Sequence, residues 1–358
     1  MGFELEKMVT QRSSEPLRFI KHNEGCTIMI HRIILIVTWF FLVNHEFLIG
    51  QDKTYQKKIT IGMIGKMTIN PVFIAAYSGA RVAAKELGAK YRAEIIIDWQ
   101  CPEKENVQEQ ATAIRRFSNQ GVDGIAISCT DANFLSPVID EVVEKGIPVM
   151  CYDSDAPKSK RFAYYGADDI EFGRMIIKEL SNVLKGTGTI AVLAGNRNAL
   201  NLQRRLQGIK EELKKYPKIN LSLDNIHHNI DIPDIASATI ARVQNANPEI
   251  NGWALVTSSA LLIKNSFSWN PGEVKVVAGN AVPAELEYVK SGYVQSLVGV
   301  NCFQYGYKSI EILLEKIVNK RAPKETSMYI QLVPVNKENV DEWSLNWKKW
   351  LIKEAVTR

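Results

Sequence analysis

Residues 59–88 read ITIGMIGKMTINPVFIAAYSGARVAAKELG, and two hydrophobic periods meet within them. The first six residues form the continuous apolar run of a buried strand. From Phe73 onward, apolar residues recur at spacings of three and four, which indicates an amphipathic helix. Pro71 suits the first turn of that helix, because its missing N–H leaves no hydrogen bond unmade there. The stretch therefore predicts a strand that passes directly into a helix, with Asn70 and Phe73 at the junction.

The same alternation of strands and helices runs through the chain from about residue 57. The strand runs TIGMIG, AEIIIDW, GIAIS and PVMCY alternate with helical segments, several of which stop at a glycine (Gly88, Gly121, Gly146). After APKSKRF, a segment rich in proline, lysine and serine, the alternation restarts with TIAVLAG and continues to VQSLVGV. Strands joined by helical crossovers form parallel sheets that are covered on both faces. We therefore expect an α/β fold of two doubly wound parallel-sheet lobes joined by hinge connections.

The expected division of the chain follows from these breaks. The N-terminal lobe is predicted to comprise residues 57–160 with 301–323, and the C-terminal lobe residues 161–300 with 325–345. Hinge connections are expected near residues 158–162, 300–302 and 321–326. Residues 346–358 are predicted to form a C-terminal tail. A tryptophan-rich run, DEWSLNWKKWL, leads into this tail. We predict that this run packs on a lobe; the alternative is that it lies on a membrane surface.

The first fifty residues differ from the rest and are predicted to be a lead segment with a signal peptide. Residues 33–43, IILIVTWFFLV, form an apolar run that is too short for a membrane span and has the length of a signal-peptide core. His31 and Arg32 precede it, and cleavage is expected before Gln51. Met29 is an alternative start, and a retained membrane anchor is the alternative to cleavage. Export to the periplasm is the interpretation we favour.

Composition and motifs exclude several classes of function. A net charge of +5 without a basic run does not indicate a nucleic-acid partner. No glycine-rich phosphate loop opens a helix, because GTGTIAVLAG has its glycines before the strand. His227 and His228 are adjacent on a strand and point to opposite faces, so a metal site is not expected. The chain also lacks a nucleophile elbow. We therefore expect no enzyme activity, no cofactor and no metal.

The cysteines are few for an exported chain. Cys26 lies in the segment predicted to be removed, and none of the other four shows the spacing of a metal site. Buried thiols are the favoured interpretation. Cys129 and Cys151 follow successive strands, so they are the pair for which a disulfide remains open.

Ligands of open parallel sheets bind beyond the carboxyl ends of the strands. Amides, carboxylates, one arginine and aromatic residues follow the strands of both predicted lobes at these ends. Carboxylates and amides accept hydrogen bonds from hydroxyl groups, an arginine donates them, and an aromatic face covers the C–H side of a sugar ring. This chemistry predicts a neutral, polyhydroxylated ligand. The residues so placed include Lys66, Asn70, Phe73, Trp99, Asp153, Asp155, Asn201, Arg205 and Asn280.

The chain resembles the periplasmic sugar-binding proteins of ABC transporters, of the ribose/galactose type (class I periplasmic binding proteins). The similar segments are TINPVFIAAYSGARVAAKELG, QGVDGIAIS, GIPVMCYDSDAP, GTIAVLAG with NLQRRLQGIKEEL, and NPEINGWALV, in the order of the family. The resemblance implies that Asn70 and Phe73 bind the sugar from one lobe, that Asp153 is the main hydroxyl acceptor and that Arg205 binds from the other lobe. Asn201 lies one turn before Arg205, and Asn280 stands where the family usually has an aspartate. Asp155 is a further candidate, whose alternative is a role in a turn or helix cap.

The resemblance also implies partners, and some residues depart from its pattern. The protein would be a monomer that captures a sugar or polyol by hinge closure and delivers it to the permease of an ABC transporter. The alternative is that it presents the ligand to a membrane sensor.

Three residues depart from the pattern of the family. Ser154, Val300 and Lys66 replace an arginine, a glutamine and a small hydroxyl residue, respectively, that are common in the family. They leave the identity of the sugar open, and also the possibility of a different small ligand.

Overall fold

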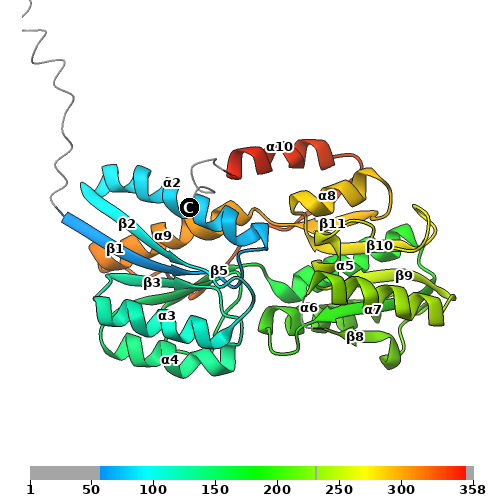
Figure 1. Cartoon of the computed structure of the whole chain (residues 1–358), viewed down its shortest axis with the longest axis horizontal. Helices are drawn as coiled ribbons and strands as arrows, with labels where there is room; N and C mark the ends of the chain where they lie inside the picture. Colours follow the sequence, from blue (N-terminus) through cyan, green and yellow to red (C-terminus); the bar gives the residue numbers. More distant parts are fainter. Residues whose placement is uncertain (1–56, 230–231, 352–358) are drawn as a thin grey trace, which may run out of the picture. The chain divides into compact units, whose positions relative to one another are not determined.

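The computed structural model describes residues 57–229 and 232–351 and contains two β-sheets (Figure 1). All strands of the first sheet run parallel. Its strand order is β12-β5-β4-β3-β1-β2. The strands are β1 (Lys57–Ile64), β2 (Ala93–Gln100), β3 (Gly124–Ile127), β4 (Val149–Tyr152), β5 (Ala163–Gly166) and β12 (Ser327–Tyr329). Helices α2 (Pro71–Tyr91) and α9 (Cys302–Val318) cover one face, and α3 (Val107–Gln120) and α4 (Ala132–Glu144) cover the other.

The second sheet has the order β13-β11-β10-β9-β6-β7, with β8 paired to β6. Its strands are β6 (Gly188–Gly195), β7 (Ile219–Asn220), β8 (Ile226–His228), β9 (Ile250–Leu255), β10 (Lys275–Asn280), β11 (Ser296–Gly299) and β13 (Val333–Asn336). Only β13 runs antiparallel to its neighbour among the described strands. The helices are α5 (Asp169–Val183), α6 (Leu200–Leu213), α7 (Pro233–Ala246), α8 (Pro283–Lys290) and α10 (Val340–Trp350). The expected fold class, two doubly wound α/β lobes, is confirmed.

Each lobe contains a helix pair that meets at glycines. In the first lobe, a Cβ on Gly306 of α9 would lie 1.7 Å from the carbonyl oxygen of Ala76 in α2. In the second lobe, a Cβ on Gly208 of α6 would lie 2.0 Å from the carbonyl oxygen of Ile170 in α5. No larger residue fits these crossings without moving a backbone. The close contacts fix α2 to α9 and α6 to α5, and α2 and α6 are the two helices that carry predicted site residues.

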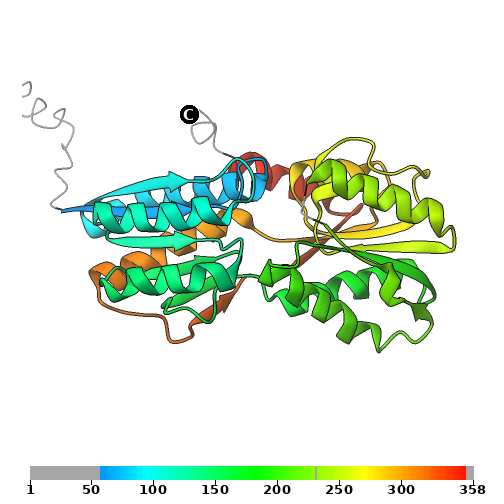
Figure 2. The ribbon, with the colours of Figure 1, turned by 60° about the horizontal axis from the view of Figure 1, so that its bottom comes forward.

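The chain passes between the two sheets at residues 167–168, 300–301 and 330–332, which can be followed in Figure 2. The passage expected near 300–302 agrees with this, but the predicted boundaries at 160 and 323–325 do not. Strands β5 and β12, which these boundaries assigned to the C-terminal lobe, pair in the first sheet.

The reason lies in the loop between β4 and β5. It contains no helix and returns the chain to pair with the preceding strand. Arg161 ties this loop down, because its guanidinium binds Asp155 and donates to the carbonyl oxygen of Thr326 at 3.0 Å. The proline- and lysine-rich break therefore belongs to the first lobe and is not a connection between lobes.

The described cysteines Cys101, Cys129, Cys151 and Cys302 are all free thiols. The sulfur atoms of Cys129 and Cys151 are 3.9 Å apart, without a disulfide between them. Within residues 57–229 and 232–351, no helix has both the length and the apolar character needed to cross a membrane. The predicted signal segment, its cleavage site and the last residues of the tail lie outside the described residues.

Candidate ligand-binding site

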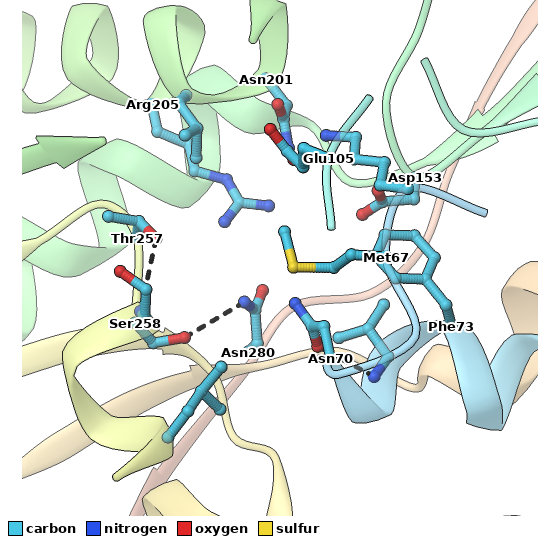
Figure 3. Close-up of a pocket in the computed structure, with 15 residues that line it drawn as sticks. Met67, Asn70, Phe73, Glu105, Asp153, Asn201, Arg205, Thr257, Ser258 and Asn280 are labelled. Atoms are coloured by element: carbon cyan, nitrogen blue, oxygen red, sulfur yellow. Dashed lines mark hydrogen bonds between the residues drawn. The ribbon is translucent and has the colours of Figure 1, made fainter. Parts of the chain in front are cut away.

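Residues of both lobes line one pocket at the carboxyl ends of the strands (Figure 3). The first lobe contributes the loop after β1, the start of α2, the loop after β2 and the residue after β4. The second lobe contributes the start of α6, the segment after β9 and the end of β10. The lining residues are Lys66, Met67, Asn70, Val72, Phe73, Glu105, Asp153, Asn201, Leu202, Arg205, Thr257, Ser258, Ser259, Leu262 and Asn280.

All predicted site residues except Trp99 and Asp155 line this pocket. Trp99 stacks on Tyr77, with ring centroids 5.0 Å apart, because its strand β2 is the edge of the sheet. Asp155 pairs with Arg161 and accepts a hydrogen bond from the backbone N–H of Ala156 at 2.7 Å. The alternative role of Asp155 in a turn therefore describes its position in the structure.

Asn70 and Phe73 are held at the pocket by the start of α2. The side-chain oxygen of Asn70 accepts from the backbone N–H of Val72 at 3.0 Å and caps the helix. Its side-chain nitrogen points into the pocket (Figure 3), so the residue has hydrogen-bond donors left for a ligand. Phe73 is buried and lines the same wall. The junction of strand and helix thus presents a donor beside an apolar ring.

Asp153 follows β4 in a left-handed backbone conformation, with φ of 56°. One of its carboxylate oxygens accepts from the hydroxyl of Ser128 at 2.7 Å, and its backbone oxygen accepts from the hydroxyl of Tyr164 at 2.9 Å. The side chain is 8% exposed and lines the pocket. A carboxylate held in this way has acceptor capacity left for ligand hydroxyls.

Arg205 enters the pocket from α6 and is oriented by two neighbours. Its Nε donates to Asp169 at 2.9 Å, and both side chains are almost fully buried. Its guanidinium lies 3.7 Å from the centroid of the Phe172 ring. Burial raises the pKa of Asp169 to about 6, although the charge of Arg205 acts in the opposite direction. The two terminal nitrogens of Arg205 point toward the pocket in Figure 3.

Asn201 and Asn280 supply amides from the second lobe. The side-chain oxygen of Asn201 accepts from the hydroxyl of Ser154 in the first lobe at 3.4 Å. The side-chain nitrogen of Asn280 donates to the hydroxyl of Ser258 at 3.4 Å, and both residues line the pocket (Figure 3). These amides add both donors and acceptors to the wall that faces Asp153.

Met67 and Glu105 are among the lining residues that were not predicted as site residues, although the range 66–73 was expected at the rim of the site. The side chain of Met67 extends into the middle of the pocket in Figure 3, and its position next to Lys66 in the loop after β1 was the available signal. Glu105 lies in the loop after β2, beyond Trp99, and accepts from the side-chain nitrogen of Asn196 in the second lobe at 3.2 Å. Glu105 lies six positions after Trp99, the residue that the sequence predicted for this end of β2.

The charges that line the pocket are balanced. Lys66 and Arg205 are cations, and Glu105 and Asp153 are carboxylates. Within the described part of the chain, no group of three or more histidine, cysteine, aspartate or glutamate residues is arranged to hold a metal ion. A site with equal numbers of both charges, several amides and one buried ring suits an uncharged ligand with many hydroxyl groups.

The sequence profile described as "periplasmic binding protein domain" matches residues 61–321. The chain belongs to this family. It is similar to the ribose import binding protein RbsB of Bacillus subtilis, with 27% identity over 43% of this chain and 48% of that protein. It is also similar to the xylose/arabinose-binding protein XylF of Sulfolobus acidocaldarius, with 20% identity over 69% of this chain and 63% of that protein. These alignments span less than two thirds of either curated relative.

Solved structures of solute-binding proteins have a similar fold. An ABC transporter solute-binding protein from Burkholderia graminis, in complex with D-arabinose, superposes with a TM-score of 0.72. The superposition covers 78% of this chain and 96% of that protein at 25% identity. The sequence profile thus shows the family, and the structural comparison shows the fold.

Proposed function

We propose that the protein is an extracytoplasmic solute-binding protein that captures a sugar or related polyol in the pocket between its lobes. The observation that carries this proposal is the carboxylate of Asp153, fixed by Ser128 and placed in one pocket with Arg205 and Phe73. A relative of the same fold is in complex with D-arabinose, and curated relatives are named for ribose, xylose and arabinose.

Each group has a distinct part in binding. Asp153 accepts hydrogen bonds from ligand hydroxyls, and Arg205, Lys66 and the amide of Asn70 donate them. Phe73 covers the C–H face of the sugar ring. The lobes close on the ligand by rotation at the three passages of the chain between the sheets. The protein acts as a monomer, without catalysis, cofactor or metal, and its N-terminal signal peptide directs it to the periplasm.

The closed form then delivers its ligand to the permease of an ABC transporter. Deletion of the gene should therefore abolish uptake of that sugar at low external concentration. Normal uptake in the deletion strain would contradict delivery to a permease and would leave binding itself unaffected.

The binding step is tested by a thermal-shift screen of pentoses, hexoses, inositols and other polyols, followed by calorimetry. A hydrogen bond to a charged group contributes about 1.5–3 kcal/mol, so Asp153→Ala should weaken binding at least tenfold. Asn70→Ala, Arg205→Ala and Phe73→Ala should weaken it as well. Lys214→Ala, at an exposed position just after α6, is the control and should leave the affinity unchanged.

The outcome that contradicts the proposal is specific. If a sugar binds and Asp153→Ala retains its affinity, the site lies elsewhere. If no polyol in the panel binds, a different small ligand occupies the pocket. Small-angle scattering should show compaction at saturating sugar, because the ligand contacts both lobes only when they close.

A further inference from the structure

The turn after β10 has an unusual backbone. Asn280 and Ala281 are consecutive residues with positive φ, at 78° and 54°. Asparagine tolerates this conformation, but a residue with a Cβ such as alanine adopts it at a cost in free energy. Two such residues in sequence persist only where the surrounding structure holds them. Asn280 lines the ligand pocket, so the contacts that hold this turn also determine where its side chain points.

Two tryptophans of the C-terminal helix hold the turn from outside the pocket. The indole nitrogens of Trp343 and Trp347 both donate to the carbonyl oxygen of Ala281, at 2.9 and 2.7 Å. A carbonyl oxygen has two lone pairs, and these two donors occupy both of them. Helix α10, which carries both rings, packs on α8 and contacts β13 and α2 (Figure 1).

The other side of the turn is held by the start of α8. The backbone N–H of Val282 donates to the carboxylate of Glu285 at 3.1 Å, and Glu285 is fully buried. The peptide between Ala281 and Val282 is therefore fixed at its oxygen by α10 and at its nitrogen by α8. A rotation of this peptide would break all three hydrogen bonds and would free the backbone of Ala281, the residue that directly follows Asn280.

We propose that Trp343 and Trp347 are positioning residues of the ligand site, which act through Ala281 to hold the amide of Asn280 in the pocket. The inference rests on the proposed function, because it assigns Asn280 a contact with the bound sugar. According to this proposal, the tryptophan-rich helix α10 contributes to ligand affinity although Trp343 and Trp347 do not line the pocket. A role in packing alone would affect the stability of the fold and leave the geometry of Asn280 unchanged.

The test replaces each indole by a ring without the N–H. Trp343→Phe and Trp347→Phe are compared with Trp350→Phe, the matched control. Trp350 lies in the same helix and packs edge-on against both rings, at centroid distances of 5.6 and 5.1 Å. The probes are D-ribose, D-xylose, D-arabinose and D-galactose, measured by calorimetry. Loss of one ordinary hydrogen bond corresponds to roughly a fivefold change in an equilibrium constant.

We expect each single variant to bind its sugar several-fold more weakly, and the double variant more than tenfold more weakly. Trp350→Phe should stay within about twofold of the parent protein. Adding Ala281→Gly to the double variant should restore most of the lost affinity, because glycine adopts a positive φ without strain. Affinity unchanged in the double variant, or equally reduced in Trp350→Phe, would overturn the proposal.

Hydrogen exchange of the ligand-free protein separates this inference from the proposed function. In the double variant, amides of residues 281–285 should exchange faster than in the parent, and in Trp350→Phe they should not. If none of the four sugars binds, the proposed function is in error for these sugars, and the exchange rates alone decide whether the tryptophans hold the turn. Unchanged exchange in the double variant would refute the positioning role.

Discussion

Glu285 provides a sharp test of the electrostatics behind the pocket. Its side chain is 0% exposed, and burial raises its pKa from 4.5 to about 8. The hydroxyl of Ser258 and the backbone amides of Val282 and Ala281 lower the pKa but do not offset the burial. The folded protein therefore binds a proton here that the unfolded chain releases at lower pH. We consider the substitution Glu285→Gln, which keeps the shape and removes the ionisation.

The size of the effect follows from the shift. The difference between 8 and 4.5 is 3.5 pKa units, and one unit corresponds to about 1.4 kcal/mol. The contribution of Glu285 to the free energy of unfolding should therefore be greatest below pH 4.5 and should fall by up to about 5 kcal/mol as the pH rises to about 8. The Glu285→Gln variant should lack this part of the decrease. At pH 8 it should be the more stable protein.

Urea unfolding at pH 5, 6, 7 and 8 measures the difference. Asp169 adds its own decrease at lower pH, because its pKa is raised to about 6, and it does so in both proteins. Burial lowers the pKa values of His227 and His228, which affects both proteins alike, so the difference between the two curves from pH 6 to pH 8 isolates Glu285. Glu287→Gln, an exposed residue of the same helix, is the control and should leave the pH dependence unchanged. Parallel curves for the parent and Glu285→Gln between pH 6 and pH 8 would refute the reasoning.

Three further predictions concern packing, specificity and processing. Gly306→Ala should lower the free energy of unfolding by about 3 kcal/mol or more in urea titrations, because the new Cβ meets the carbonyl oxygen of Ala76; a smaller loss would mean that α9 shifts easily. Met67→Ala should widen the pocket and raise the affinity for hexoses relative to pentoses, as measured by calorimetry; an unchanged ratio would place Met67 outside the binding volume. Mass spectrometry of periplasmic material should find a mature protein that begins near Gln51, and an intact segment from residue 29 to 50 would contradict cleavage.

The fold was predictable because its signal repeats along the chain. Most strands are short apolar runs followed by a helix with three- and four-residue spacing, so errors at single elements leave the architecture unchanged. The lobe boundaries were less predictable. The segment between β4 and β5 has the composition of a linker, but the pairing of β5 with β4 and the ion pair between Arg161 and Asp155 show that it folds back onto its own sheet.

The candidate site was predictable at the carboxyl ends of central strands. Asp153 directly follows β4 and Asn280 is the last residue of β10, and both line the pocket. Trp99 was misplaced because the sequence does not reveal that β2 is an edge strand. Glu105 was missed because its loop reaches the pocket only through the three-dimensional path of the chain. The support of Asn280 by α10 joins residues more than sixty positions apart, which no local pattern records.

The three passages of the chain between the sheets have a consequence for the order of folding during synthesis. The first sheet contains early and late parts of the described chain, because its edge strand β12 comes from residues 327–329 and α9 covers the same face as α2. When the ribosome has completed β5, the glycine-lined face of α2 still lacks its partner helix. The second lobe is made in the interval, and it is the first unit whose parallel core of strands and helices is continuous in sequence. The sheet of the nascent N-terminal half therefore lacks α9, one of the two helices that cover this face, until residue 318 has been made.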